Sequence, residues 1–148
     1  FLHGRLWAEP RQGPAAPFHV LHDVPPVEAT DAEFPLRLTT GRRLDSFNTG
    51  VQSGSFRSPL RRGETIDLSP TDAARYGVVD GEVVLVSSRR GQVRAPVRID
   101  AGLRPGLVFM TFHFPDEVDT NLLTIDATDP RSGTAEFKAA AVRVDRLS

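Results

Sequence analysis

The sequence predicts a mainly β domain built as a closed or nearly closed barrel. Several short apolar or alternating runs are separated by glycine and proline turns, and one short helix has a clear start signal. At 148 residues the chain has the length of one ordinary domain and is long enough to bury a single core.

The first 33 residues differ in composition from the rest. Five prolines lie in this stretch, and they forbid long helices and interior strands. Scattered apolar residues, among them Trp7 and Phe18, indicate that the stretch packs on a surface. We therefore expect residues 1–33 to form an extended proline-rich linker and residues 34–148 to form the barrel domain.

Regular structure is expected to begin at residues 34–40, where Leu36 and Leu38 alternate with Arg37 as in a half-exposed strand. Residues 42–62 follow as a long polar loop, and loops of this length in compact domains are usually functional or disordered. Its arginines need an anionic partner, so we expect the loop to be mobile without a ligand. A second strand is predicted at residues 65–68.

The clearest helix start in the chain follows the second strand. Ser69 is a suitable N-cap, Pro70 suits the first helical position, and Asp72 stands where a capping box places its carboxylate. The helix is predicted to be short and to end at Tyr76, with Gly77 as the left-handed residue after it.

The remaining strands are predicted at residues 82–88, 92–100, 107–112 and 139–147. The run 92–100 alternates cleanly, which puts Val93, Ala95, Val97 and Ile99 on the inner face. Pro96 points outward and cannot donate to a strand ladder, so this strand is expected at an edge or a seam.

Composition narrows the function classes. The formal net charge is -1, which gives no general reason to expect nucleic acid or an anionic membrane as partner. No apolar run approaches the ~20 residues of a membrane span. There is no cysteine, which excludes disulfides, Fe–S ligation, thiolate zinc sites and a cysteine nucleophile within this chain. The chain opens with Phe1 rather than methionine, so we expect a fragment or a processed product.

Local motifs give few candidates for chemistry. Three of the four histidines lie in the proline-rich segment and no nucleophile elbow is present, which argues against an independent hydrolase. His113 precedes several acidic residues, but the spacing does not resemble a known metal site. The run Thr40-Gly41-Arg42-Arg43 offers donors for an anion, although a glycine turn with exposed arginines is the simpler interpretation.

The order of the motifs is more informative than any one of them. They follow one another as residues 38–42 (LTTGR), 48–50 (NTG), 69–74 (SPTDAA), 87–91 (SSRRG), 121–124 (NLLT), 129–130 (DP) and 136–138 (EFK). In this order they resemble the C-terminal dinucleotide-binding domain of molybdopterin oxidoreductases, the family of formate dehydrogenases, nitrate reductases and dimethyl sulfoxide reductase. The resemblance covers Phe34 to about Asp145, and residues 112–115 (FHFP), 48–52 (NTGVQ) and 3–7 (HGRLW) look most like formate dehydrogenase catalytic subunits.

The resemblance implies a six-stranded double-psi β-barrel with short flanking helices. It also implies that the domain binds part of a bis(molybdopterin guanine dinucleotide) cofactor carrying molybdenum or tungsten. It implies no catalytic residue and no metal ligand in this chain. The residues that match the cofactor-binding motifs are Thr40, Gly41, Arg42, Arg43, Leu44, Asn48, Thr49, His113, Asn121 and Lys138.

The implied parent enzyme converts formate to carbon dioxide, or the reverse, and passes electrons through the pterin and Fe–S centres to an acceptor such as NAD. Its other catalytic domains, which would supply the Fe–S clusters and the metal-ligating cysteine or selenocysteine, and its electron-transfer subunits are the expected partners. We expect a cytoplasmic enzyme and an isolated chain that is inert and without cofactor. Two alternatives remain: a nitrate reductase-type member, or a stand-alone barrel that acts as a binding or adaptor module.

Overall fold

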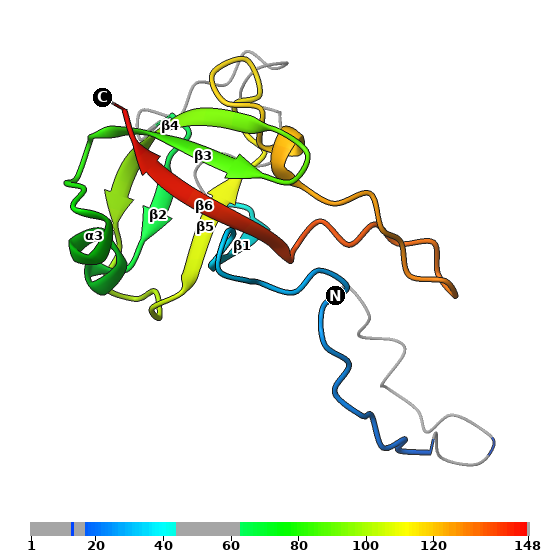
Figure 1. The fold of residues 1–148 in the computed structure, drawn as a ribbon. Coiled ribbons are helices and arrows are strands. Elements are labelled where there is room, and N and C mark those ends of the chain that lie inside the picture. Colours follow the sequence, from blue (N-terminus) through cyan, green and yellow to red (C-terminus); the bar gives the residue numbers. More distant parts are fainter. Residues whose placement is uncertain (1–12, 14–16, 44–62, 148) are drawn as a thin grey trace, which may run out of the picture.

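A computed structural model describes residues 13, 17–43 and 63–147. Within them six strands close a barrel in the order β1-β5-β2-β4-β3-β6, and two short helices flank it (Figure 1). The predicted six-stranded double-psi β-barrel is confirmed. The elements are β1 Leu36–Gly41, β2 Ile66–Leu68, α3 Pro70–Tyr76, β3 Val83–Ser88, β4 Gln92–Ile99, β5 Leu107–Thr111, the 3-10 helix η1 Thr120–Leu123 and β6 Ala140–Arg146. Most of the predicted loop 42–62 lies outside the described residues, so its expected mobility stays a prediction.

Two parallel strand pairs organise the barrel. β1 pairs with β5 in parallel and β2 pairs with β4 in parallel, whereas the other neighbours are antiparallel. In the β1–β5 pair Gly41 lies opposite Thr111. Because both strands run in the same direction, the residues that follow them emerge together at one end of the barrel.

The barrel interior is filled by the side chains that face inward at alternate positions along the strands. Leu36 and Leu38 of β1 are fully buried, as their alternation with Arg37 predicts. Val93, Ala95 and Val97 of β4 are also buried, but the expectation that Ile99 faces inward is wrong. Ile99 is 37% exposed because it lies beyond the last β3–β4 pair, Val83 with Pro96, and Asp80 caps its N–H at 2.8 Å.

Pro96 does not mark a sheet edge, since β4 lies between β2 and β3 in the closed barrel. Val97 donates its N–H to the Glu82 carbonyl on the β3 side, at 2.8 Å. Successive residues of a strand alternate in direction, so the nitrogen of Pro96 faces β2. The β2–β4 ladder begins only at Ile66 with Val97. Pro96 therefore lies just before the first β2–β4 pair, where no ladder hydrogen bond from its nitrogen is needed. Of the two positions expected for this strand, the structure has the seam between two strands and not the sheet edge.

Helix α3 has the ends that its sequence predicts. The Ser69 hydroxyl accepts the N–H of Asp72 at 3.0 Å and donates to the Asp72 carboxylate at 2.7 Å. The same carboxylate accepts the N–H of Gly106 at 2.8 Å, so it also holds the turn before β5. Gly77 ends the helix with φ 65°, in the left-handed region that favours glycine.

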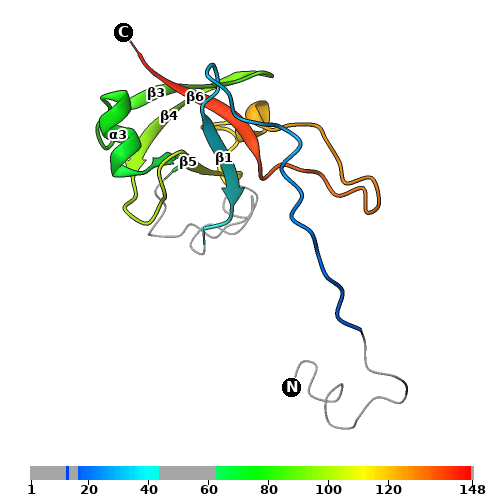
Figure 2. The same cartoon turned by 60° about the horizontal axis from the view of Figure 1, so that its bottom comes forward.

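The first described residues of the N-terminal segment extend away from the barrel, whereas residues 27–31 lie against it (Figures 1 and 2). Phe18, Leu21 and Val24 are exposed, whereas Glu28 contacts the barrel through arginines of the β3–β4 turn. The division into a linker and a barrel at residue 33 stays a prediction. Among the described residues, no helix is long and apolar enough to cross a membrane.

Candidate functional site

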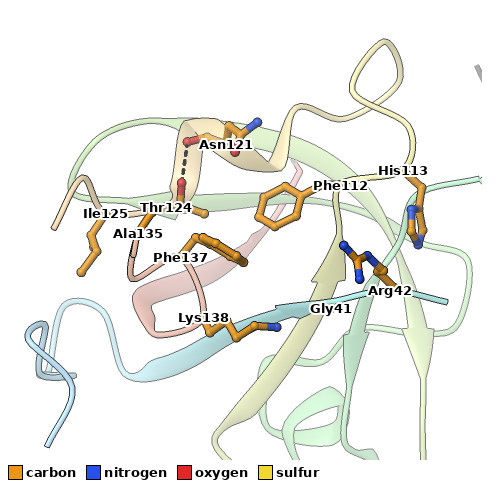
Figure 3. Close-up of a pocket in the computed structure, with 10 residues that line it drawn as sticks. All are labelled: Gly41, Arg42, Phe112, His113, Asn121, Thr124, Ile125, Ala135, Phe137 and Lys138. Atoms are coloured by element: carbon orange, nitrogen blue, oxygen red, sulfur yellow. Dashed lines mark hydrogen bonds between the residues drawn. The ribbon is translucent and has the colours of Figure 1, made fainter. Parts of the chain in front are cut away.

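A pocket of about 640 Å³ opens where β1 and β5 end (Figure 3). Four segments of the chain supply its walls: the end of β1, the loop after β5, η1 with the residues after it, and residues 135–138, which precede β6. The lining residues are Gly41, Arg42, Phe112, His113, Asn121, Thr124, Ile125, Ala135, Phe137 and Lys138.

Two aromatic rings form the apolar wall of the pocket. Phe112 and Phe137 meet edge to face, with ring centroids 5.7 Å apart and planes at 78°. Figure 3 shows both rings between the segment that carries Asn121 and the end of β1. This wall is suited to a flat ligand that buries one face against it.

Lys138 stands beside this wall at the end of β1. Its Nζ donates to the Thr40 carbonyl at 3.0 Å and lies 5.6 Å from the Phe137 ring centroid. The Thr40 hydroxyl donates to the Phe137 carbonyl at 3.0 Å, and Thr40 itself is buried. These two hydrogen bonds fix the lysine-bearing segment against β1, and they leave the ammonium with further N–H donors.

Packing against Phe109 disfavours a side chain at Gly41, on the pocket floor. A β-carbon at this position would lie 2.8 Å from Cε2 and 3.2 Å from Cζ of Phe109. The sequence singles out Gly41 only as part of a run that offers donors for an anion. The structure adds a reason for glycine here, because the ring of β5 occupies the space of a side chain.

The side chains of Arg42 and Arg43 point to different parts of the domain. Arg42 is exposed and lines the pocket. The Arg43 guanidinium turns to the barrel instead, where it donates to the Asp67 carboxylate at 2.9 and 3.0 Å and to the Thr65 hydroxyl at 2.6 Å. Asp67 is buried and also pairs with Arg98. The structure therefore places the Arg43 side chain in an ion-pair network away from the pocket lining.

His113 is held rigidly at the pocket wall and is only 1% exposed. Its Nε2 accepts the N–H of Arg43 at 2.8 Å, so that nitrogen carries no proton in this arrangement. Its backbone N–H donates to the Thr111 hydroxyl, which in turn donates to the buried Glu64 carboxylate. The ring links the chain after β1 to the chain after β5.

Asn121 lies on η1 at the pocket rim and is exposed. The Asp119 carboxylate accepts its N–H at 3.1 Å, and its carbonyl accepts the Thr124 hydroxyl at 3.1 Å. Both bonds use the backbone N–H and carbonyl of Asn121. Its side-chain amide can therefore act as both donor and acceptor towards a ligand.

Five of the predicted site residues thus share one pocket: Gly41, Arg42, His113, Asn121 and Lys138. Thr40 supports it from behind, whereas Leu44, Asn48 and Thr49 lie outside the described residues. The other lining residues are not among the predicted site residues. Phe112 follows β5 and Phe137 precedes Lys138, but only the folded barrel shows that their rings meet.

The charge of the pocket is one-sided. Arg42 and Lys138 are cationic, and none of the lining residues that the structure describes is acidic. No group of three or more His, Cys, Asp or Glu among the described residues could hold a metal ion. Together with the aromatic wall, this arrangement favours an organic anion with a flat ring system.

Fold and site together define a ligand-binding double-psi barrel domain. A family model, the molydopterin dinucleotide binding domain, matches residues 36–141. The chain belongs to this family. It is 42% identical over 122 residues to the F420-dependent formate dehydrogenase 2 subunit alpha of Methanococcus maripaludis, covering 81% of this chain and 18% of that protein.

A second relative is the assimilatory nitrate reductase of Haloferax mediterranei, 39% identical over 142 residues, with 93% of this chain and 19% of that protein covered. The chain thus spans about a fifth of the length of the relatives that it matches. Among solved structures, the acetylene hydratase of Pelobacter acetylenicus superposes with a TM-score of 0.65 at 18% identity, covering 78% of this chain and 19% of that one. This likeness shows the fold.

Proposed function

We propose that this domain holds one part of a bis(molybdopterin guanine dinucleotide) cofactor, with molybdenum or tungsten, in a formate dehydrogenase-type enzyme. The observation that carries the proposal is the pocket at the ends of β1 and β5, which combines Arg42 and Lys138 with the Phe112–Phe137 wall. A dinucleotide offers anionic phosphates and flat heterocycles, which are the chemical features that this lining fits.

The residues of the pocket suggest a division of roles. Arg42 and Lys138 would bind phosphate oxygens, and the Asn121 amide would hydrogen bond to the edge of a heterocycle. Thr40 and His113 would keep the two strand ends in place through the hydrogen bonds described above. The bound group would supply the two-electron redox chemistry, whereas this chain would bind and orient it and exclude water.

Formate is the proposed substrate class of the whole enzyme. The matches to formate dehydrogenase alpha subunits from two methanogens, at 42% and 34% identity, support it. A nitrate reductase-type parent is the second candidate, because the Haloferax relative is 39% identical over a longer stretch. Reduction of nitrate without oxidation of formate by the purified parent enzyme would favour that second candidate.

The remaining domains of the catalytic subunit, with Fe–S clusters, and electron-transfer subunits are the proposed partners. The cysteine-free sequence supports a metal ligand located outside this chain. We propose that the parent enzyme is cytoplasmic. One relative is named a periplasmic nitrate reductase, so the periplasm is the competing location, and cell fractionation distinguishes the two.

The experiment that tests the site is cofactor retention in the parent enzyme. Lys138→Ala, Asn121→Ala and Arg42→Ala should each lower the metal and guanine nucleotide recovered per polypeptide, because each removes a proposed contact. Arg94→Ala is the matched control, since Arg94 is an exposed arginine of β4 that does not line the pocket. Full cofactor content in all three pocket variants would refute the assignment.

A further inference from the structure

The β3–β4 turn contacts the wall of the pocket from outside. Arg90 of this turn donates to the Leu123 carbonyl through Nη2 at 2.9 Å and through Nε at 3.3 Å. At Gly91 a β-carbon would lie 2.9 Å from the Leu122 carbonyl oxygen, so only glycine lets the turn approach this closely. Both carbonyls belong to η1, which carries Asn121.

Arg90 is itself fixed by a residue of the N-terminal segment. The Glu28 carboxylate accepts Nη1 of Arg90 at 2.8 Å and Nη2 at 2.9 Å, a bidentate pair. It also accepts Nη1 of Arg89 at 2.7 Å and the backbone N–H of Ala141 in β6 at 2.7 Å. The Glu28 side chain is only 10% exposed, whereas the Arg90 side chain is 28% exposed, so the carboxylate is the more buried partner of this bridge.

We propose that the Glu28–Arg90 pair is a positioning device for the cofactor pocket: it sets the place of η1 and hence of Asn121, Thr124 and Ile125 on the pocket wall. The guanidinium uses one edge for the carboxylate and the other for the Leu123 carbonyl. A lysine in its place has no planar fork and cannot make both contacts in this geometry. The inference deepens the proposed function, because it takes the pocket as the cofactor site.

This arrangement couples the segment before the barrel to the ligand site. Residues 27–31 line a shallow groove with residues 125–127, and the Val27 N–H donates to Glu136 at 3.2 Å. Glu28 and Asn121 lie far apart in the sequence, and Arg90 with Leu123 is the physical connection between them. The position of the Asn121 wall therefore depends on the docking of the linker.

Hydrogen exchange in this chain tests the inference without any cofactor. Glu28→Gln and Arg90→Lys should each speed exchange of the Leu122 and Thr124 amides, on the order of tenfold, since each loses a charge-assisted hydrogen bond. The amide of Val97, bonded to Glu82 across β3 and β4, reports global opening and should change much less. Glu33→Gln and Arg94→Lys, both exposed, are the controls.

A double-mutant cycle tests the route. If the effect of Glu28 passes through Arg90, then Glu28→Gln should add little exchange in the Arg90→Lys background. Unchanged exchange at 122 and 124 in Glu28→Gln, additive effects in the cycle, or equal acceleration at Val97 would overturn the inference. Glu28→Gln leaves the Arg90 side chain itself unchanged and decides the question if Arg90→Lys does not fold.

Cofactor content separates this inference from the function on which it rests. In the parent enzyme, Arg90→Lys should lower recovered cofactor while Lys138→Ala lowers it further. If the exchange effects occur but Lys138→Ala, Asn121→Ala and Arg42→Ala all retain full cofactor, the proposed function fails and the positioning of η1 stands. If exchange is normal in Arg90→Lys and cofactor is lost only in the pocket variants, the proposed function stands and the positioning of η1 by Arg90 fails.

Discussion

At the residue scale, Gly41 links barrel packing to the pocket. Its missing side chain leaves room for the Phe109 ring, which lies 2.8 Å from the position of a β-carbon. Gly41→Ala should lower the free energy of unfolding by about 1 kcal/mol, because the half-buried Phe109 ring must shift to make room for the methyl group. Urea unfolding measures this change.

Phe109→Leu provides the control for that prediction, because it removes the ring from the space beside Gly41. In the Phe109→Leu background the cost of Gly41→Ala should fall by at least half, as expected for two residues in contact. An equal cost in both backgrounds would show that the glycine is needed for another reason.

Arg42 and Arg43 show where sequence reasoning about single residues ends. Both match the cofactor-binding motifs, and only Arg42 lines the pocket, so a cofactor contact of Arg43 stays a prediction. The Arg43 guanidinium is taken by Asp67 and Thr65, which belong to another part of the chain. A motif gives the residue type and its place near a strand end, but the direction of a long side chain depends on partners that only the fold brings near.

At the scale of elements, the Glu28 carboxylate is one of the groups that dock the N-terminal segment on the barrel. Burial by itself would raise the pKa of Glu28, but hydrogen bonds from Arg90, Ala141 and Arg89 outweigh it and hold the pKa at about 2, below the ordinary 4.5. A pKa lowered on folding stabilises the protein above the ordinary value, and this contribution is lost as pH falls from about 5 to 2.

The stability difference between the wild type and Glu28→Gln should therefore depend on pH. Near pH 6 the wild type should be more stable by about 1–2 kcal/mol, since solvent screens the half-exposed arginines, and the difference should shrink by about half at pH 3. Urea unfolding at both pH values measures it. Glu33→Gln, in the same segment but exposed, is the control. The same pH response in both variants would contradict the role of Glu28.

Elements with local signals were predictable from the sequence. The Ser69 cap, the Gly77 terminus and the alternation of Leu36 and Leu38 all depend on neighbours within a few residues, and the structure confirms them. Ile99 was misassigned because burial at a strand end depends on where the neighbouring strand stops. That is a property of strand pairing and not of the alternation in residues 92–100.

At the scale of the whole molecule, barrel closure creates the pocket. The parallel pairing of β1 with β5 places Gly41 beside Thr111, so Arg42 and His113 follow at the same end. The sequence pattern predicted a barrel, and the order of motifs predicted which kind. Neither could show that Phe112 and Phe137 form one wall, because their contact results from the closed strand order.

We expect the dinucleotide cofactor to bind at the end of the barrel formed by β1 and β5. A structure of the parent enzyme with its cofactor bound is the most direct test. It should show a phosphate or heterocycle atom within hydrogen-bond distance of Lys138 Nζ and of the Asn121 side chain. A cofactor that contacts this domain only at the opposite end, near α3, or does not contact it at all, would refute this assignment.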